Sequence, residues 1–156
     1  MTWVVGGRHA FCARCISDIQ VTLEYANNEK KPGGYVQKVH KISDDLVIAF
    51  ADCIRLAFAI IEAIKTEYAT NYDQRLLSIP NELAKDLIRF IRYKFNKLKR
   101  DGERVEFLIF IKPSNPFRDF GLFKCVSPEF KIEQPNNPFQ IMEIGSGSRL
   151  LNIVNS

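Results

Sequence analysis

The stretch Ile54–Tyr68, IRLAFAIIEAIKTEY, is apolar on almost every face at helical spacing, which is typical of a helix buried between other elements. A second helix is predicted over Asn81–Lys99, where one apolar stripe is flanked by Lys and Arg. We expect the two helices to form an antiparallel pair on one face of a sheet. Four of their residues should be buried between the layers: Phe58, Ile61, Leu87 and Phe90.

Segments with strand patterns lie on both sides of this helical region. The predicted strands before it are Thr2–Val5, His9–Ser17 with a Gly6-Gly7 hairpin turn between them, Gln20–Tyr25, Tyr35–Ile42 and Leu46–Ala51, with a polar loop over residues 27–34. Those after it are Val105–Lys112, Gly121–Val126 and Phe139–Ile144, and a last helix begins at Arg149. Separate runs of strands and helices predict an α+β fold with antiparallel sheets flanked by helices.

Length and charge exclude several classes of protein. The 156 residues are expected to form one domain, 1–156, and an apolar share of 46% supplies a sizeable core. The net charge of +4 is weaker than a dedicated nucleic-acid binder requires. The longest apolar run, Leu56–Ile61, is too short to cross a bilayer, and the first residues lack a secretory-signal pattern. We therefore expect a cytoplasmic protein with no membrane or nucleic-acid partner.

Cys12 and Cys15 form a C-x-x-C pair, a spacing that occurs in metal and redox sites. In a strand, a separation of three residues places the two side chains on opposite faces. No second Cys pair or His pair completes a zinc set. We therefore expect reduced structural thiols, no metal site and no cofactor.

Thr2 follows the start methionine, so removal of Met1 would give a first residue with both a hydroxyl and a free α-amine. An α-amine titrates near pH ~8 and can act as general base for the neighbouring hydroxyl. Three further segments accompany Thr2 in chain order: Ser17–Thr22 (SDIQVT), Gln37–Val39 (QKV) and Gly145–Ser148 (GSGS). Each motif is weak alone, and the four in this order are fairly specific.

In this combination the chain resembles the proteasome-type threonine peptidases, and within them most closely the bacterial HslV-type peptidases. That family begins with a nucleophilic threonine, matched by Thr2, and carries an aspartate sixteen residues later in a D-x-Q/R-x-T context, matched by Asp18. Its lysine before valine is matched by Lys38, and its Gly-Ser-Gly turn by Gly145–Gly147. The resemblance covers essentially the whole chain and implies an αββα sandwich of the N-terminal nucleophile hydrolase type.

The resemblance also implies a role for each matched residue. Lys38 would favour the deprotonated hydroxyl of Thr2, Asp18 would pair with Lys38, and Ser146 would hydrogen-bond the terminal amine. Because Thr2 and Lys38 each start a strand, we expect those two strands to lie side by side in one sheet. Four residues would contribute to substrate binding: Gln20, Thr22, Ala51 and Asp52.

Three departures from the family pattern bear on activity. A glycine amide usually serves as oxyanion donor where this chain has Ala51-Asp52-Cys53, and an aspartate charge there would oppose a developing oxyanion. The chain stops at Ser156, so we expect a C-terminally shortened fold that lacks the family's second supporting aspartate. Retention of Met1 would leave Thr2 without its free amine.

These residues predict a threonine-type peptidase subunit that hydrolyses peptide bonds through an acyl-enzyme on Thr2 after removal of Met1. The resemblance implies a homo-oligomeric ring, peptides or unfolded proteins as substrates, and an ATPase unfoldase as partner. The alternative is a non-catalytic proteasome-like assembly or interaction protein, which Asp52 and the short C-terminus favour. A second alternative, nucleic-acid binding by the basic helix Lys85–Arg100, has no recognition motif to accompany it.

Overall fold

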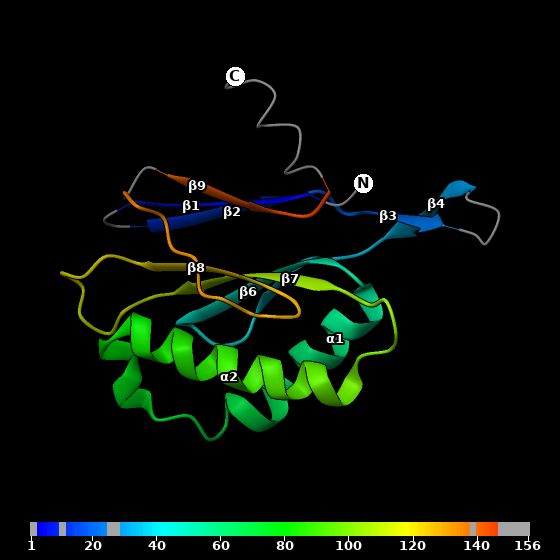
Figure 1. The fold of residues 1–156 in the computed structure, drawn as a ribbon. Coiled ribbons are helices and arrows are strands. Elements are labelled where there is room, and N and C mark those ends of the chain that lie inside the picture. The colour runs from blue at the N-terminus through cyan, green and yellow to red at the C-terminus, as the bar shows by residue number, and fades with distance from the viewer. Residues whose placement is uncertain (1–2, 10–11, 25–28, 138–139, 147–156) are drawn as a thin grey trace.

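The computed structural model describes residues 3–9, 12–24, 29–137 and 140–146, and Figure 1 shows their arrangement. The strands are β1 (Val4–His9), β2 (Cys12–Ser17), β3 (Gln20–Glu24), β4 (Lys30–Tyr35), β5 (Val39–Lys41), β6 (Leu46–Asp52), β7 (Val105–Ile111), β8 (Gly121–Val126) and β9 (Ile141–Ile144). The helical segments are α1 (Ile54–Ala63), a π-helical turn (Ile64–Tyr68), a 3-10 turn (Gln74–Ser78) and α2 (Pro80–Leu98). The features predicted at Thr2, Phe139 and residues 147–156 lie outside the described residues.

The described elements form three stacked layers, with α1 and α2 below two sheets in the view of Figure 1. The inner sheet, which contacts the helices, has the order β5-β6-β7-β8, and the outer sheet has the order β2-β1-β9. Strands β3 and β4 make a separate two-stranded ribbon. Every pairing is antiparallel, which confirms the predicted α+β class of antiparallel sheets with helices outside them.

The larger core lies between the helices and the inner sheet. It contains large, fully buried side chains, among them Phe50, Phe95, Phe107, Phe123, Phe130, Leu56 and Ile60. Of the four residues predicted for this interface, Ile61 and Leu87 are fully buried, and Phe58 and Phe90 are half-buried against the same cluster. The predicted helix–sheet interface is therefore confirmed.

The second core, between the two sheets, is smaller and is built from Val4, Ala49, Ala51, Leu108, Phe110, Leu122, Met142 and Ile144. Gly6 and Gly7 lie inside β1 beside this core, so the prediction of a hairpin turn at these glycines is wrong. A Cβ on Gly6 would lie 2.6 Å from Phe110 Cζ, whereas nothing lies within 4 Å of a Cβ on Gly7. The close approach of the two sheets therefore requires glycine at position 6. In the amino-acid sequence, a glycine that permits such a close contact cannot be distinguished from a glycine that forms a turn.

Strand β4 occupies much of the segment for which the sequence predicts a polar loop, so that prediction is wrong for residues 30–34. Proline at position 32 is tolerated because each strand of a two-stranded ribbon has an edge that needs no N–H donor. A register shift between Val21 and Thr22 accommodates the irregular pairing. Turn-forming residues therefore did not exclude a strand at this edge of the molecule.

The strands that begin near Thr2 and Lys38 do not lie side by side, contrary to expectation. Strand β1 belongs to the outer sheet and β5 to the inner sheet. Residues of the two segments can meet only across the sandwich. The predicted site therefore lies between layers and not along one sheet.

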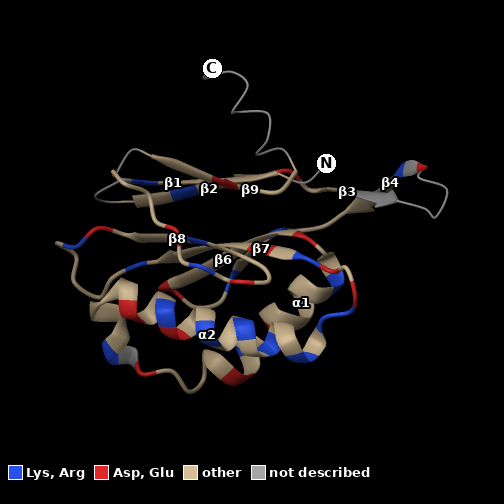
Figure 2. Cartoon of the chain, viewed as in Figure 1, with Lys and Arg blue, Asp and Glu red and all other residues tan. Residues whose placement is uncertain are grey.

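Helix α2 carries both basic and acidic residues along its length in Figure 2, and most of them are exposed. Two of its lysines pair with carboxylates, Lys85 with Glu82 at 2.7 Å and Lys94 with Glu67 at 2.5 Å. This mixture is the pattern of a solvated helix face. Among the described residues, no helix combines the length and apolar character that a membrane span requires.

Candidate active site

Lys38 is 1% exposed, the smallest fraction for any charged residue in the described part of the chain. It comes directly before β5, and its carbonyl accepts a hydrogen bond from Phe50 N at 3.0 Å. Its Nζ donates to Asp18 Oδ1 at 2.6 Å and to the carbonyl of Gln20 at 3.2 Å. A buried ammonium is costly unless such acceptors surround it, so the structure around Lys38 is arranged to hold a cation.

Asp18 follows β2 and connects Lys38 to the beginning of the described chain. Its Oδ1 also accepts from Trp3 N at 2.9 Å, and its own N–H donates to Trp3 O at 3.1 Å. The Asp18 side chain is 30% exposed. The structure thus brings Lys38 and Asp18 together beside the residue that follows Thr2, while Thr2 itself lies outside the described residues.

Gln20 and Thr22, predicted to bind substrate, are both in β3. The carbonyl of Gln20 accepts from Lys38, and the Gln20 side chain is exposed. The backbone of Thr22 is paired with Pro32 of β4. Within the described residues β3 pairs with no other strand, so its second edge is open to an added strand.

Ala51 and Asp52, also predicted near the substrate, end β6 just before α1. Ala51 is fully buried between the sheets, so only its backbone can face a ligand. Asp52 is exposed and has a φ of 74°, a left-handed conformation that Asp tolerates better than most non-glycine residues.

The peptide N–H of Asp52 faces the side of β6 on which Lys38 lies. On that side Phe50 N donates to Lys38 O, whereas Cys53 N donates to Arg104 O on the β7 side. N–H groups alternate between the two edges of a strand, so the amide of Asp52 points to the same side as that of Phe50. A backbone donor therefore faces the Lys38 side of the strand, as an oxyanion site would require.

A hollow of about 970 Å³ opens beside the end of β6, and we call it the acidic hollow. Its lining includes the predicted residues Asp52 and Ser146, together with Glu103, Glu106 and Arg104. Desolvation and, to a smaller extent, the charge of Glu106 raise the pKa of Asp52, and Arg104 opposes this shift. Asp52 and Ser146 thus line the same hollow. Lys38 and Asp18, which contact each other, are not among the residues that line it.

Glu103 in this hollow is engaged by neighbouring donors. Arg55 Nε donates to its Oε1 at 2.9 Å, Arg100 N donates to its Oε2 at 2.8 Å, and the Cys53 thiol contacts Oε1 at 3.3 Å. The hydrogen bond from Arg55, followed by that from Arg100, lowers the pKa of Glu103 to about 2. This network ties the start of α1 to the turn before β7.

Sequence reasoning missed Glu106, whose Oε2 accepts from Gly145 N at 2.9 Å. The sequence pattern of β7 could have indicated this residue, because Glu106 lies on the same face of the strand as Leu108 and Phe110, which pack between the sheets. A carboxylate in an otherwise apolar row is costly unless it is hydrogen-bonded. The pattern of β7 therefore indicates a specific acceptor role at position 106.

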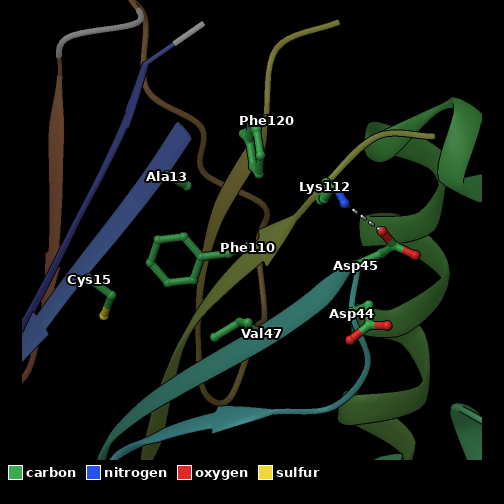
Figure 3. Close-up of a pocket in the computed structure, with 8 residues that line it drawn as sticks. All are labelled: Ala13, Cys15, Asp44, Asp45, Val47, Phe110, Lys112 and Phe120. Atoms are coloured by element: carbon green, nitrogen blue, oxygen red, sulfur yellow. Dashed lines mark ion pairs between the residues drawn. The ribbon is translucent and has the colours of Figure 1, made fainter. Parts of the chain in front are cut away.

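A second hollow, of about 280 Å³, lies between β2 and the inner sheet (Figure 3). It is lined by Ala13, Cys15, Asp44, Asp45, Val47, Phe110, Lys112 and Phe120, and none of these is a predicted site residue. Burial raises the pKa of the Cys15 thiol to about 11, which leaves little nucleophilic thiolate. Cys12 and Cys15 are unbonded thiols, and no group of three or more His, Cys, Asp or Glu within the described ranges could hold a metal ion.

No protein-family model and no curated protein matches this chain. Solved structures do match. Anbu, the ancestral beta-subunit from Yersinia bercovieri, gives a TM-score of 0.74 at 14% identity, covering 98% of this chain and 64% of that chain. The Gly-1 mutant of Anbu from Hyphomicrobium sp. strain MC1 gives 0.72 at 16% identity, covering 99% and 66%. Eukaryotic HslV from Trypanosoma brucei gives 0.60 at 18% identity, covering 93% and 72%.

The chain has a proteasome-like fold. Because Anbu and HslV both match, the likeness supports the N-terminal nucleophile hydrolase architecture without selecting the HslV-type branch that the sequence resembles. At identities of 14% to 18% the likeness concerns the fold alone. The chain spans 64% of the length of the Yersinia Anbu that it matches.

Proposed function

We propose that this chain is a threonine-type peptidase subunit in which Thr2 is the nucleophile after removal of Met1. The observation that carries the proposal is the buried ion pair of Lys38 and Asp18, 2.6 Å from Nζ to Oδ1, which is hydrogen-bonded to Trp3 N. That nitrogen is covalently bound to the carbonyl carbon of Thr2. Lys38 Nζ donates to two acceptors among the described residues, and its third N–H would serve the hydroxyl oxygen of Thr2.

The reaction proposed is acyl transfer to the Thr2 hydroxyl. The α-amine takes the hydroxyl proton while Oγ1 attacks the peptide carbonyl carbon, and the positive charge of Lys38 favours the alkoxide. The carbon–nitrogen bond then breaks, and the amine passes the proton to the leaving nitrogen, which leaves an ester on Thr2. Water, activated by the same amine, hydrolyses the ester and restores the hydroxyl. The amide of Asp52 would donate to the oxyanion.

Two further features support this assignment. The β1–β9 pairing matches Val4 with Ile144, so the turn that carries Ser146 follows β9 at the end of the outer sheet where β1 begins. Ser146 would then hydrogen-bond the terminal amine. The open edge of β3, which contains Gln20 and Thr22, would bind the peptide as an added strand.

The test is peptide hydrolysis by protein whose intact mass shows that Met1 is absent. Thr2→Ala should lower kcat by at least ~10³-fold, because the nucleophile acts as a unit with its base. Its melting temperature should stay close to that of the wild type. A threonine-directed covalent inhibitor should add to the wild type and not to Thr2→Ala. Full hydrolysis by Thr2→Ala would exclude the mechanism.

Asp52 favours a second candidate, a non-catalytic proteasome-like assembly or interaction protein. Its carboxylate lines the acidic hollow with Ser146, and a charge there would oppose an oxyanion. Asp52→Gly removes the charge and suits the φ of 74°, which glycine adopts without strain. If the wild type is inactive, hydrolysis by Asp52→Gly would place the defect at Asp52. Inactivity of both proteins, with Met1 removed, would favour the non-catalytic role.

We also propose that the chain assembles into a homo-oligomeric ring and degrades unfolded proteins with an ATPase unfoldase. The sequence resemblance and the proteasome-like fold support this proposal, and one matched structure is itself described as a beta-subunit. Size-exclusion chromatography with multi-angle light scattering, run at micromolar concentration, should show a single large species. A monomer at micromolar concentration would contradict the ring.

A further inference from the structure

Glu106 is a charged residue in an apolar row of β7. Strand residues alternate between faces, so Glu106, Leu108 and Phe110 face the outer sheet, while Val105 and Phe107 face the helices. Leu108 and Phe110 pack into the core between the sheets. A carboxylate at the end of this row is partly removed from water, so it needs a compensating hydrogen bond.

That hydrogen bond runs to the turn after β9. Oε2 of Glu106 accepts from Gly145 N at 2.9 Å, across 39 residues of sequence. Gly145 has a φ of 95° and stands between Ile144, which is buried in the core between the sheets, and Ser146, which lines the acidic hollow. The bond thus joins a central strand of the inner sheet to the turn that carries Ser146. A carboxylate is a strong acceptor for a backbone N–H.

Glu106 also lies beside the end of β6. It is directly opposite Ala51 in the β6–β7 register, and Asp52 is the next residue of β6. Both Glu106 and Asp52 line the acidic hollow. One carboxylate therefore contacts the Gly145–Ser146 turn and adjoins the segment whose amide is the proposed oxyanion donor.

We propose that Glu106 is a positioning residue that holds the Gly145–Ser146 turn against the inner sheet and so sets the place of Ser146 at the active site. The structural part of this inference stands on the hydrogen bond, and the catalytic part rests on the proposed peptidase function. Glu106 acts through the turn and need not touch the substrate. Its removal should therefore slow the reaction more than it weakens binding.

The test compares Glu106→Ala with Glu106→Gln, which keeps an oxygen acceptor for Gly145 N and removes the charge. Exchange of the Gly145 amide should accelerate at least ~10-fold in Glu106→Ala and stay within ~3-fold of wild type in Glu106→Gln. A small displacement of Ser146 should lower kcat by about 10- to 100-fold in Glu106→Ala with KM changed less than ~3-fold. Glu106→Gln should recover most of the lost kcat.

Glu143→Ala is the matched control, since Glu143 is a half-buried carboxylate of β9 that precedes the same turn and faces away from the core between the sheets. It should leave the exchange of Gly145 unchanged. Unchanged exchange in Glu106→Ala, or equal loss of kcat in Glu106→Ala and Glu106→Gln, would overturn the inference. If the wild type hydrolyses no peptide, the proposed function fails, and the exchange of Gly145 alone decides whether Glu106 holds the turn.

Discussion

The two cores of this molecule are built from different materials. The core between the helices and the inner sheet contains large aromatic and aliphatic side chains such as Phe107 and Phe123. The core between the sheets includes Ala49 and Ala51 and is closed by the contact between Gly6 and Phe110. The first contains most of the buried hydrophobic residues, and the second lets the two sheets approach closely.

The charged side chains that connect layers are also distributed unevenly between the two interfaces. The fully buried cation of the described residues, Lys38, bridges from the inner sheet to Asp18 beside the outer sheet. Glu106 makes a similar bridge to Gly145. The two charged bridges lie at the interface between the sheets, so substitutions in the helix–sheet core should change stability and leave kcat unchanged.

The largest effect is expected for Lys38→Ala. It should lower kcat by about 10³-fold, because the cation beside the proposed nucleophile is lost. It should also lower the free energy of unfolding by about 3 kcal/mol, the lower end for breaking a buried pair, since Asp18 is 30% exposed. Urea unfolding and peptide hydrolysis measure both quantities. Lys41→Ala is the control, because its ion pair with Asp44 is exposed and screened by solvent.

Leu87→Ala probes the helix–sheet core and should affect stability alone. Leu87 is fully buried, so the substitution should cost about 3 kcal/mol through lost transfer energy and a cavity. The kcat per folded molecule should stay unchanged, because none of the candidate site residues belongs to this core. Leu98→Ala, on the same helix and 36% exposed, should cost roughly 0.5 kcal/mol or less. A fall in kcat for fully folded Leu87→Ala would show that the helix–sheet core also affects the reaction.

Gly6→Ala probes the closeness of the two sheets. The new Cβ would lie 2.6 Å from Phe110 Cζ, so we expect a cost of about 2 kcal/mol from overpacking. Gly7→Ala places its Cβ in open space and should cost far less. Thermal unfolding of both variants measures the difference. Equal melting temperatures would show that Phe110 moves aside freely and that the sheets are not held at close contact.

The smallest effect is a pH dependence at Asp52. Partial desolvation beside the acidic hollow, followed by the charge of Glu106, raises the native pKa of Asp52 above the value in the unfolded chain, so the native state binds its proton more readily. The carboxylate therefore costs stability at neutral pH, and that cost disappears as pH falls through the native pKa. Asp52→Asn should be slightly more stable than wild type at pH 7, with an advantage that shrinks toward pH 4. Urea midpoints across this range measure it, and a growing advantage in acid would reverse the sign assigned here.

Much of the fold was predictable because amphipathic patterns are local. Strand β8 occupies Gly121–Val126 as predicted, and α2 spans Pro80–Leu98 against a predicted Asn81–Lys99. The glycines at positions 6 and 7 were misread, since glycine marks a turn and a close contact alike. For β4, the turn-forming residues predicted a loop, but pairing with β3 makes the segment a strand.

The candidate site divides in the same way. The spacing of Thr2, Asp18 and Lys38 and most of the order of strands and helices could be read from the amino-acid sequence, because helices and strands follow from patterns among neighbouring residues. The resemblance implied that Asp18 pairs with Lys38, but the sequence did not show that this pair connects two different sheets or that Glu106 accepts a hydrogen bond from Gly145 N. The physical reason is that periodicity along a strand records that one face is buried. It carries no information about which distant residue covers that face.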